Sequence, residues 1–189
     1  MQRSNPMRTL FRFLLVAALL VGAYLFVAPY LRSALYAMRL ASMPAPEFVT
    51  IPVSGVRPQG LRDTWHGARS GGRQHEGIDI FARRGTEVRS ATEGIVLRVG
   101  TNPLGGRVVW VLGPGAQRHY YAHLDRYAEV SAGMRIGAGT VLGFVGTTGN
   151  AAGTPPHLHY GVYQAGGAIN PYPLLRKGGP RLQAREAAN

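Results

Sequence analysis

Two histidines stand two positions apart near the C-terminal end of the sequence, in PPHLHYGVY (residues 155–163). In an extended strand, residues two apart project from the same face, roughly 6–7 Å apart. That spacing suits two ligands, or a ligand and a base, at one metal ion. The prolines before His157 exclude a helix running into the segment, and the β-branched and aromatic residues around His159 favour a strand.

Two upstream segments carry side chains of the same chemical kind. His75 and Asp79 stand four apart in QHEGIDI (residues 74–80), and His123 ends YYAH (residues 120–123). Zinc accepts imidazole and carboxylate ligands. An isolated H-x-H pair is equally well explained by two histidines on a half-buried strand. Three separated segments of this composition favour a metal site instead.

Three further candidates have simpler explanations. His119 precedes His123 by four residues and can share its strand face, but a surface or supporting histidine is the simpler interpretation. His66 is expected in a solvated loop. Glu76 invites comparison with the glutamate base of H-E-x-x-H peptidases, but that motif requires a histidine where this sequence has Asp79. We therefore expect Glu76 to face solvent.

Short strands separated by glycines dominate the sequence from residue 77 onward. No segment after residue 60 has a sustained helical period, so the predicted fold class is all-β, with roughly 120 residues available for a core. A short turn of helix is expected at residues 172–176. Strands are predicted at residues 78–81, 87–91, 94–99, 107–112, 117–123, 140–145 and 157–163.

Two of these segments, GIVLRVG (residues 94–100) and GTVLGFVG (residues 139–146), are similar in plan. Lipoyl and biotinyl carrier domains show the same pattern and need a modified lysine at a hairpin tip. The only lysine of this chain is Lys177, near its C-terminal end. A carrier function is therefore not expected.

The N-terminal region contains a candidate membrane span. Residues 13–31 carry no charged side chain, which just meets the length needed to cross the hydrocarbon core as a helix. Three arginines precede the span, and no acidic residue occurs before Glu47. This charge distribution favours a cytoplasmic N-terminus and an exported C-terminal domain. A cleaved signal peptide is the alternative, since Ala34 and Ala37 are small residues near a possible cleavage point.

The expected domain organisation follows from these features. Three prolines between residues 41 and 57 indicate an extended linker after the anchor. We predict a cytoplasmic N-terminus (1–12), a transmembrane anchor (13–31), a linker (32–60), a folded domain (61–176) and a disordered tail (177–189).

The composition limits the environments and the partners that are expected for this chain. The chain has no cysteine, so no disulfide or thiolate chemistry is available. The net charge is +12, and the first forty residues contribute five arginines to it and no acid. An arginine-rich surface suits an anionic polymer. No basic stretch is interleaved with aromatic residues, so nucleic acid is not expected, and the anionic cell wall or lipid head groups fit an exported domain better.

Taken in order, these segments resemble the lysostaphin-like (LytM-type) zinc metallopeptidases, which cut peptidoglycan peptides. The resemblance covers about residues 61–175. It rests on H-x-x-x-D at 75–79, Y-A-H-L at 121–124, H-L-H at 157–159 and the glycine-rich GTTGN at 146–150. It implies a compact antiparallel β-sheet or sandwich of the duplicated hybrid motif type, with the site in a groove between loops.

The resemblance also implies roles for individual residues. The metal ligands of that family match His75, Asp79 and His159, with one zinc ion per chain, and its catalytic histidines match His123 and His157. The implied function is a membrane-anchored endopeptidase that hydrolyses cross-links or stem peptides of peptidoglycan. The implied location is the bacterial inner membrane, with a single span and the domain in the periplasm.

Two departures and one alternative accompany this interpretation. An aromatic residue and then an acid often follow H-L-H in the family, whereas residues 160–162 are YGV here, and the loop at residues 65–73 leaves the groove-lining aromatic unassigned. The family also contains degenerate members that bind and activate cell-wall amidases without hydrolysis. That alternative predicts missing ligands, whereas all five matched positions are filled here.

Overall fold

The computed structural model of the protein describes residues 6–177. They divide into a helical unit and a β unit, and the division falls between Tyr36 and Ala37. The predicted disordered tail lies outside the described residues, apart from Lys177, which ends the short helix α2 (Tyr172–Lys177) expected at this position.

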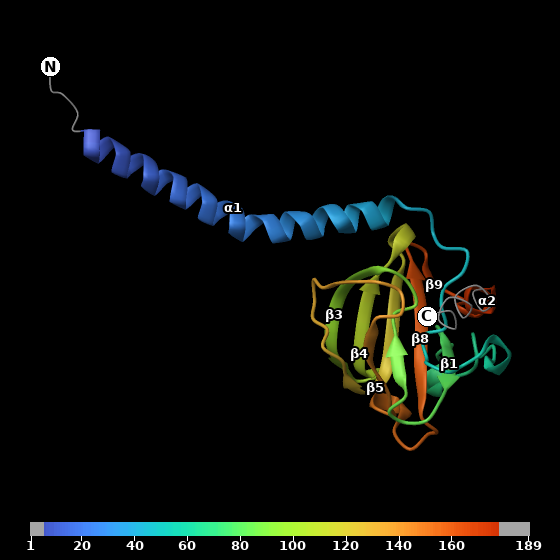
Figure 1. Ribbon diagram of the computed structural model, residues 1–189. Helices are drawn as coiled ribbons and strands as arrows, with labels where there is room; N and C mark the ends of the chain where they lie inside the picture. Colours follow the sequence, from blue (N-terminus) through green and yellow to red (C-terminus); the bar gives the residue numbers. More distant parts are fainter. Residues whose placement is uncertain (1–5, 178–189) are drawn as a thin grey trace. The chain divides into compact units, whose positions relative to one another are not determined.

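Helix α1 (Pro6–Ser42) has 37 residues, which corresponds to about 55 Å at 1.5 Å per residue. It is longer than the predicted span because leucine, alanine, methionine and arginine continue on both sides, and these residues favour helix. Residues 32–42, predicted as linker, are therefore helical. The helix bends near its middle, and Pro29 inside it removes a backbone donor there (Figure 1).

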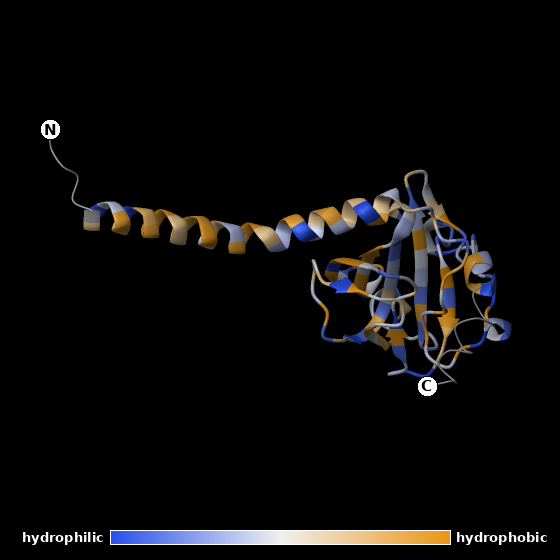
Figure 2. Ribbon diagram, turned by 45° about the horizontal axis from the view of Figure 1, so that its top comes forward, coloured by the Kyte–Doolittle hydropathy of each residue, from blue (hydrophilic) through white to orange (hydrophobic). Residues whose placement is uncertain are grey.

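The apolar surface of α1 is suited to a membrane. Its most apolar 18-residue window has a mean hydropathy of 2.4, and none of that window is buried. Figure 2 shows the apolar residues around the helix along its first half. A helix that is apolar all round and unburied fits a membrane span, and a signal sequence has the same properties.

Nine strands within the described residues form one antiparallel sheet, which confirms the all-β prediction (Figure 1). The order is β1-β8-β5-β4-β3-β6, with β7 paired to β5 and β2, and β9 paired to β8. The strands are β1 (Ile78–Phe81), β2 (Glu87–Arg89), β3 (Gly94–Asn102), β4 (Gly106–Leu112), β5 (Arg118–Tyr127), β6 (Arg135–Ile136), β7 (Val141–Val145), β8 (His157–Gln164) and β9 (Gly167–Ile169). The short 3-10 helices are η1 (Pro58–Gly60), η2 (Ser70–Gly72), η3 (Pro114–Ala116) and η4 (Gly149–Ala151).

All seven predicted strands are present, and two of them continue three or four residues beyond their predicted ends. Strand β3 continues to Asn102 and β5 to Tyr127, because both form ladders with neighbours distant in sequence. Strands β6 and β9 were not predicted, since two or three residues beside glycines give no periodic signal. The long β5 pairs with β4, β8 and β7, and it is the central strand of the unit.

The two faces of the central sheet differ in chemistry. In β8, Leu158 and Tyr160 are fully buried in the main hydrophobic core, whereas His157 and His159 line a groove on the other face. Successive strand residues point to opposite faces, so one short sequence supplies both the core and the groove. Core-facing residues of β1, β4, β5 and β8 include Ile78, Ile80, Val109, Val111, Tyr121, Leu158 and Tyr160.

Candidate metal centre

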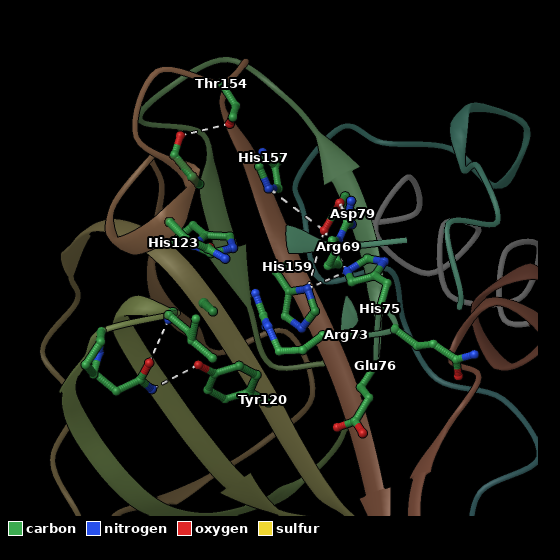
Figure 3. A pocket seen from close by; sticks show the side chains of 18 of the residues that line it. Arg69, Arg73, His75, Glu76, Asp79, Tyr120, His123, Thr154, His157 and His159 are labelled. Carbon is green, nitrogen blue, oxygen red and sulfur yellow. Dashed lines mark hydrogen bonds and ion pairs between the residues drawn. The ribbon is translucent and has the colours of Figure 1, made fainter. Parts of the chain in front are cut away.

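A groove of about 1130 Å³ lies over this second face of the sheet (Figure 3). Strands β1, β4, β5 and β8 contribute to it, together with the segment before β1 and the loops that contain η2 and η4. All five residues with predicted metal or catalytic roles line it: His75, Asp79, His123, His157 and His159.

Three of these side chains converge closely enough to share one ion. Ligand atoms of His75, Asp79 and His159 all lie within 4.8 Å of one another. Nε2 of His75 is 2.7 Å from Nδ1 of His159, and Oδ1 of Asp79 is 3.1 Å from the first nitrogen and 3.4 Å from the second. Ligands about 2.0–2.1 Å from a tetrahedral zinc lie roughly 3.3 Å apart. The two separations that involve Asp79 are close to this value, and the two ring nitrogens need to move apart by only about 0.6 Å to share a zinc ion.

Strand register places two members of this cluster. Asp79 in β1 and His159 in β8 are direct cross-strand partners, and Ala122 in β5 is the partner of His159 on its other side. Because Ala122 is small, the space above the neighbouring positions Asp79, His159 and Ala122 stays open. The groove therefore forms where β1, β8 and β5 lie side by side.

His75 precedes β1 and is held by Thr64 in the preceding loop. Nδ1 of His75 donates to the carbonyl of Thr64 at 2.7 Å, so Nε2 keeps its lone pair toward the cluster. The hydroxyl of Thr64 accepts a bond from the backbone N–H of Asp79 at 3.0 Å. One loop residue thus fixes both the histidine and the strand that carries the carboxylate.

Gly77 allows the close approach of these elements. A Cβ at this position would lie 2.6 Å from the carbonyl oxygen of Tyr160 and 2.7 Å from Cε1 of His159. Both distances are shorter than any ordinary van der Waals contact. A side chain at position 77 would therefore displace either the backbone of β8 or the ring of His159.

His157 and His123 face each other beside the cluster. Their ring centroids are 5.0 Å apart, and Nε2 of His157 is 3.8 Å from Oδ1 of Asp79. Nδ1 of His157 donates to the carbonyl of Pro155 and Nδ1 of His123 to that of Thr148, each at 2.8 Å. Because each Nδ1 donates a hydrogen bond, the neutral form of either ring carries its lone pair on Nε2.

Burial and neighbouring charge tune the site. Burial opposes ionisation of Asp79, but the interactions of its carboxylate with the His159 and His75 rings outweigh burial, so the pKa of Asp79 lies well below its usual value. Burial also lowers the pKa of His159, and it lowers the pKa of His123 to about 4 despite the bond to Thr148. At neutral pH the site therefore holds one carboxylate and at least two neutral imidazoles. These are the protonation states that bind a metal ion or accept a hydrogen bond from water.

The remaining candidates lie apart from the cluster. Glu76 is exposed at the rim of the groove, and His66 is exposed in its loop, where it stacks on Trp65 at a centroid distance of 4.5 Å. His119 was predicted to be either a surface or a supporting histidine, and the surface alternative is wrong. This residue is fully buried on the core side of β5 and bonds the hydroxyl of Tyr160 at 2.7 Å. It is a supporting residue of the core, with no contact to the metal cluster.

Three aromatic residues of the groove and one arginine were not predicted from the sequence. Trp110 packs on Tyr120 and Tyr163 at centroid distances of 4.3 and 5.3 Å, and all three line the groove. Burial raises the pKa of Tyr163 to about 12, so it stays a neutral phenol. Period-2 alternation in β4, β5 and β8 was the signal available for these residues. Arg69 forms an ion pair with Asp79, and no pattern in the sequence predicts this contact.

Comparison with known proteins agrees with this site. The model of peptidase family M23 matches residues 73–171. The L-Ala--D-Glu endopeptidase of Bacillus subtilis (strain 168) is 41% identical over 127 residues, which cover 61% of this chain and 39% of that protein. The DD-carboxypeptidase/endopeptidase Mpg of Neisseria meningitidis is 33% identical over 134 residues, 71% of this chain and 29% of that protein.

A solved structure shares the fold. The catalytic domain of lysostaphin from Staphylococcus simulans superposes with a TM-score of 0.56 at 28% identity, covering 63% of this chain and 95% of that domain. The chain therefore matches nearly the whole of that catalytic domain, although it spans only 39% and 29% of the two curated relatives.

Proposed function

This chain belongs to peptidase family M23, and we propose that it is a membrane-anchored zinc endopeptidase acting on the peptides of peptidoglycan. The observation that carries the proposal is the convergence of His75, Asp79 and His159 beside two further histidines with free Nε2 atoms. The endopeptidase names of the relatives support it, and they point to stem-peptide or cross-link bonds as substrates.

The proposed metal ligands are His75 Nε2, Asp79 Oδ1 and His159 Nδ1. Three protein ligands leave one position for water or substrate, as in catalytic rather than structural zinc sites. A zinc ion bound there lowers the pKa of a water molecule toward neutrality and polarises the scissile carbonyl.

We assign proton transfer to His157. Its Nε2 faces the cluster, 3.8 Å from Oδ1 of Asp79, and the bond from Nδ1–H to Pro155 keeps the lone pair on Nε2. This atom can take the proton of the attacking water and then pass it to the departing amine. His157 is two residues from His159, so it remains beside the ligand set without belonging to it.

We assign His123 the orientation of the water. Its pKa of about 4 keeps the ring neutral, and Nδ1–H is already donated to Thr148, so Nε2 is an acceptor at neutral pH. An acceptor can align a water molecule, whereas a donor is needed to stabilise an oxyanion. His123 lies where it could align the water or stabilise the oxyanion. Alignment of the water is the role that fits this tautomer.

The regulator alternative is not favoured, because the site retains every matched side chain and the relatives are named as peptidases. For location, α1 is long and apolar enough to anchor the chain, and we propose that the β unit lies outside the cytoplasm, where a peptidoglycan-acting domain meets its substrate. A C-terminal alkaline phosphatase fusion should be active. Retention of α1 on the mature protein would show that α1 is an anchor, and its removal would show that it is a cleaved signal peptide.

Digestion of purified peptidoglycan tests the activity. The full-length protein in detergent is incubated with sacculi, and the released fragments are identified by mass spectrometry. New peptide termini that disappear on zinc chelation and return with added zinc are the expected result. Release without new peptide termini, or activity unaffected by chelation, would overturn the proposal. His157→Ala is the matched inactive control.

A further inference from the structure

Arg69 directly contacts the proposed ligand Asp79. Nη2 of Arg69 is ion-paired with Oδ2 of the carboxylate, while Oδ1 faces the ring nitrogens of His75 and His159 (Figure 3). The two oxygens of Asp79 thus have separate partners. The arginine side chain is 36% exposed and the carboxylate 10%, so the pair lies at the wall of the groove with the acid on the inner side.

The backbone of a hairpin brings Arg69 to this place. Ala68 and Gln74 form an isolated antiparallel bridge, and the N–H of Arg69 donates to the carbonyl of Arg73 at 2.9 Å. The turn between the two arginines contains Gly71 and Gly72, whose φ angles of 73° and 71° suit glycine. Arg69 and Arg73 therefore stand opposite each other, and both line the groove.

The same hairpin leads directly into the first proposed ligand. The N–H of His75 donates to the carbonyl of Gly67 at 3.0 Å, and the N–H of His66 donates to the carbonyl of His75 at 2.9 Å. These bonds connect the position of Arg69 to the backbone of His75. The arginine is thus part of the framework that holds the ligands, and its side chain extends from a constrained backbone.

A guanidinium beside a ligand carboxylate can act in two opposite ways. It can compete with the metal cation for the acid, or it can hold one oxygen so that the other is presented in a fixed direction. The division of partners favours the second action, because Arg69 uses the oxygen that does not face His75 and His159. A charge-assisted bond to Oδ2 also restricts rotation of the carboxylate.

We propose that Arg69 is a positioning residue that presents Oδ1 of Asp79 alone to the zinc ion. This inference rests on the zinc site of the proposed function. Partners that hydrogen-bond metal ligands typically contribute 10–100-fold to metal affinity. Arg69 therefore strengthens zinc binding although it is itself a cation.

Zinc affinity measured apart from activity tests the proposal. The full-length protein in detergent is stripped of metal and titrated with zinc against a chromophoric chelator at pH 7. Arg69→Gln should bind zinc about 10–100-fold more weakly than the unmodified protein. Arg69→Lys should recover part of the loss, since it keeps the charge and a donor but lacks the planar fork.

Arg73→Gln is the matched control. It removes the same charge from the opposite arm of the hairpin, where Nε of Arg73 donates to the carbonyl of Ser70 at 3.3 Å. Zinc affinity should stay within about twofold in this variant. The absorption spectrum of cobalt-substituted protein should change in Arg69→Gln and remain the same in Arg73→Gln, because only the first alters the ligand geometry.

Each outcome bears on the proposal. Unchanged zinc affinity in Arg69→Gln would overturn it, and tighter binding would also overturn it by showing that the arginine competes with the metal. Equal losses in both variants would assign the effect to charge or to the hairpin and not to the bond with Asp79. Failure of the unmodified protein to bind zinc would instead refute the proposed zinc site, so the two failures are distinguishable.

Discussion

Ala122 and His123 are consecutive residues of strand β5, yet both side chains line the groove. Regular alternation would send His123 to the core side, with Tyr121. His123 instead has a φ of 63°, and its N–H donates to the carbonyl of Gly105 at 2.7 Å. A left-handed conformation costs a non-glycine residue about 1–2 kcal/mol. The site therefore contains a backbone distortion that brings a second imidazole beside His157.

This distortion predicts an inverted preference between glycine and alanine. Both His123→Gly and His123→Ala remove the imidazole, but only alanine keeps the left-handed penalty. We expect the glycine variant to be more stable by about 1 kcal/mol in denaturant unfolding. At Ala122, which pairs regularly with His159, glycine should be the less stable residue. The same order at both positions would contradict the explanation.

The proposed ligands are tested by metal content. Replacement of His75, Asp79 or His159 by alanine should lower zinc occupancy sharply after dialysis, because two remaining side chains hold the ion poorly. Elemental analysis gives the occupancy. His66→Ala removes an exposed histidine of the neighbouring loop and should retain full occupancy. Full occupancy in His159→Ala would show that the ligand assignment is wrong.

Sequence reasoning identified the elements better than their fine geometry. The short strands separated by glycines predicted the all-β fold. The order of the three histidine segments predicted a shared site, and the five side chains do line one groove. Alternation within a strand is a local property, so it can be read from residue types. It also separates the core residue Leu158 from its groove-facing neighbours His157 and His159.

Other features depend on tertiary contacts that residue types do not encode. The left-handed backbone of His123 and the ion pair of Arg69 with Asp79 exist because loops distant from β5 and β1 hold them. The burial of His119 was missed because a histidine four residues from a candidate site carries no signal of its face. The helix beyond residue 31 was missed because charged residues ended the apolar run without ending the helix.

The catalytic assignment predicts that binding and turnover separate. Alanine at His157 or at His123 should leave zinc bound while lowering turnover by roughly 10²–10⁴-fold, as loss of an acid–base group typically does. Turnover is followed on purified peptidoglycan and zinc by elemental analysis. Retained hydrolysis in either variant would refute its catalytic role. Loss of zinc would indicate a closed site in which that histidine is a fourth ligand.

Gly77 should be intolerant of even one methyl group. In Gly77→Ala the new Cβ would meet the carbonyl of Tyr160 and the ring of His159 at 2.6–2.7 Å, so β8 or the ring must move. We expect a loss of about 1–3 kcal/mol in unfolding free energy, as for other overpacked sites, together with weaker zinc binding. Gly137→Ala is the matched control, because its Cβ would meet nothing within 4 Å. A tolerated Gly77→Ala would mean that the two strands are less closely fixed than this register requires.

The buried His119 predicts an acid-sensitive fold. Burial lowers its pKa from 6.5 to about 4, and its Nε2 has no hydrogen-bond partner among residues 6–177. Between these two pH values the unfolded chain binds the proton and the folded chain does not, so the free energy of unfolding decreases as the pH falls from about 6.5 to about 4. The full effect corresponds to about 3 kcal/mol. His119→Asn, which can keep a bond to Tyr160 without titrating, should lose stability at pH 7 but show a shallower decline on acidification. The comparison uses denaturant unfolding of metal-free protein, in which the groove histidines contribute equally to both chains. An equally steep decline in His119→Asn would show that His119 is not the group responsible.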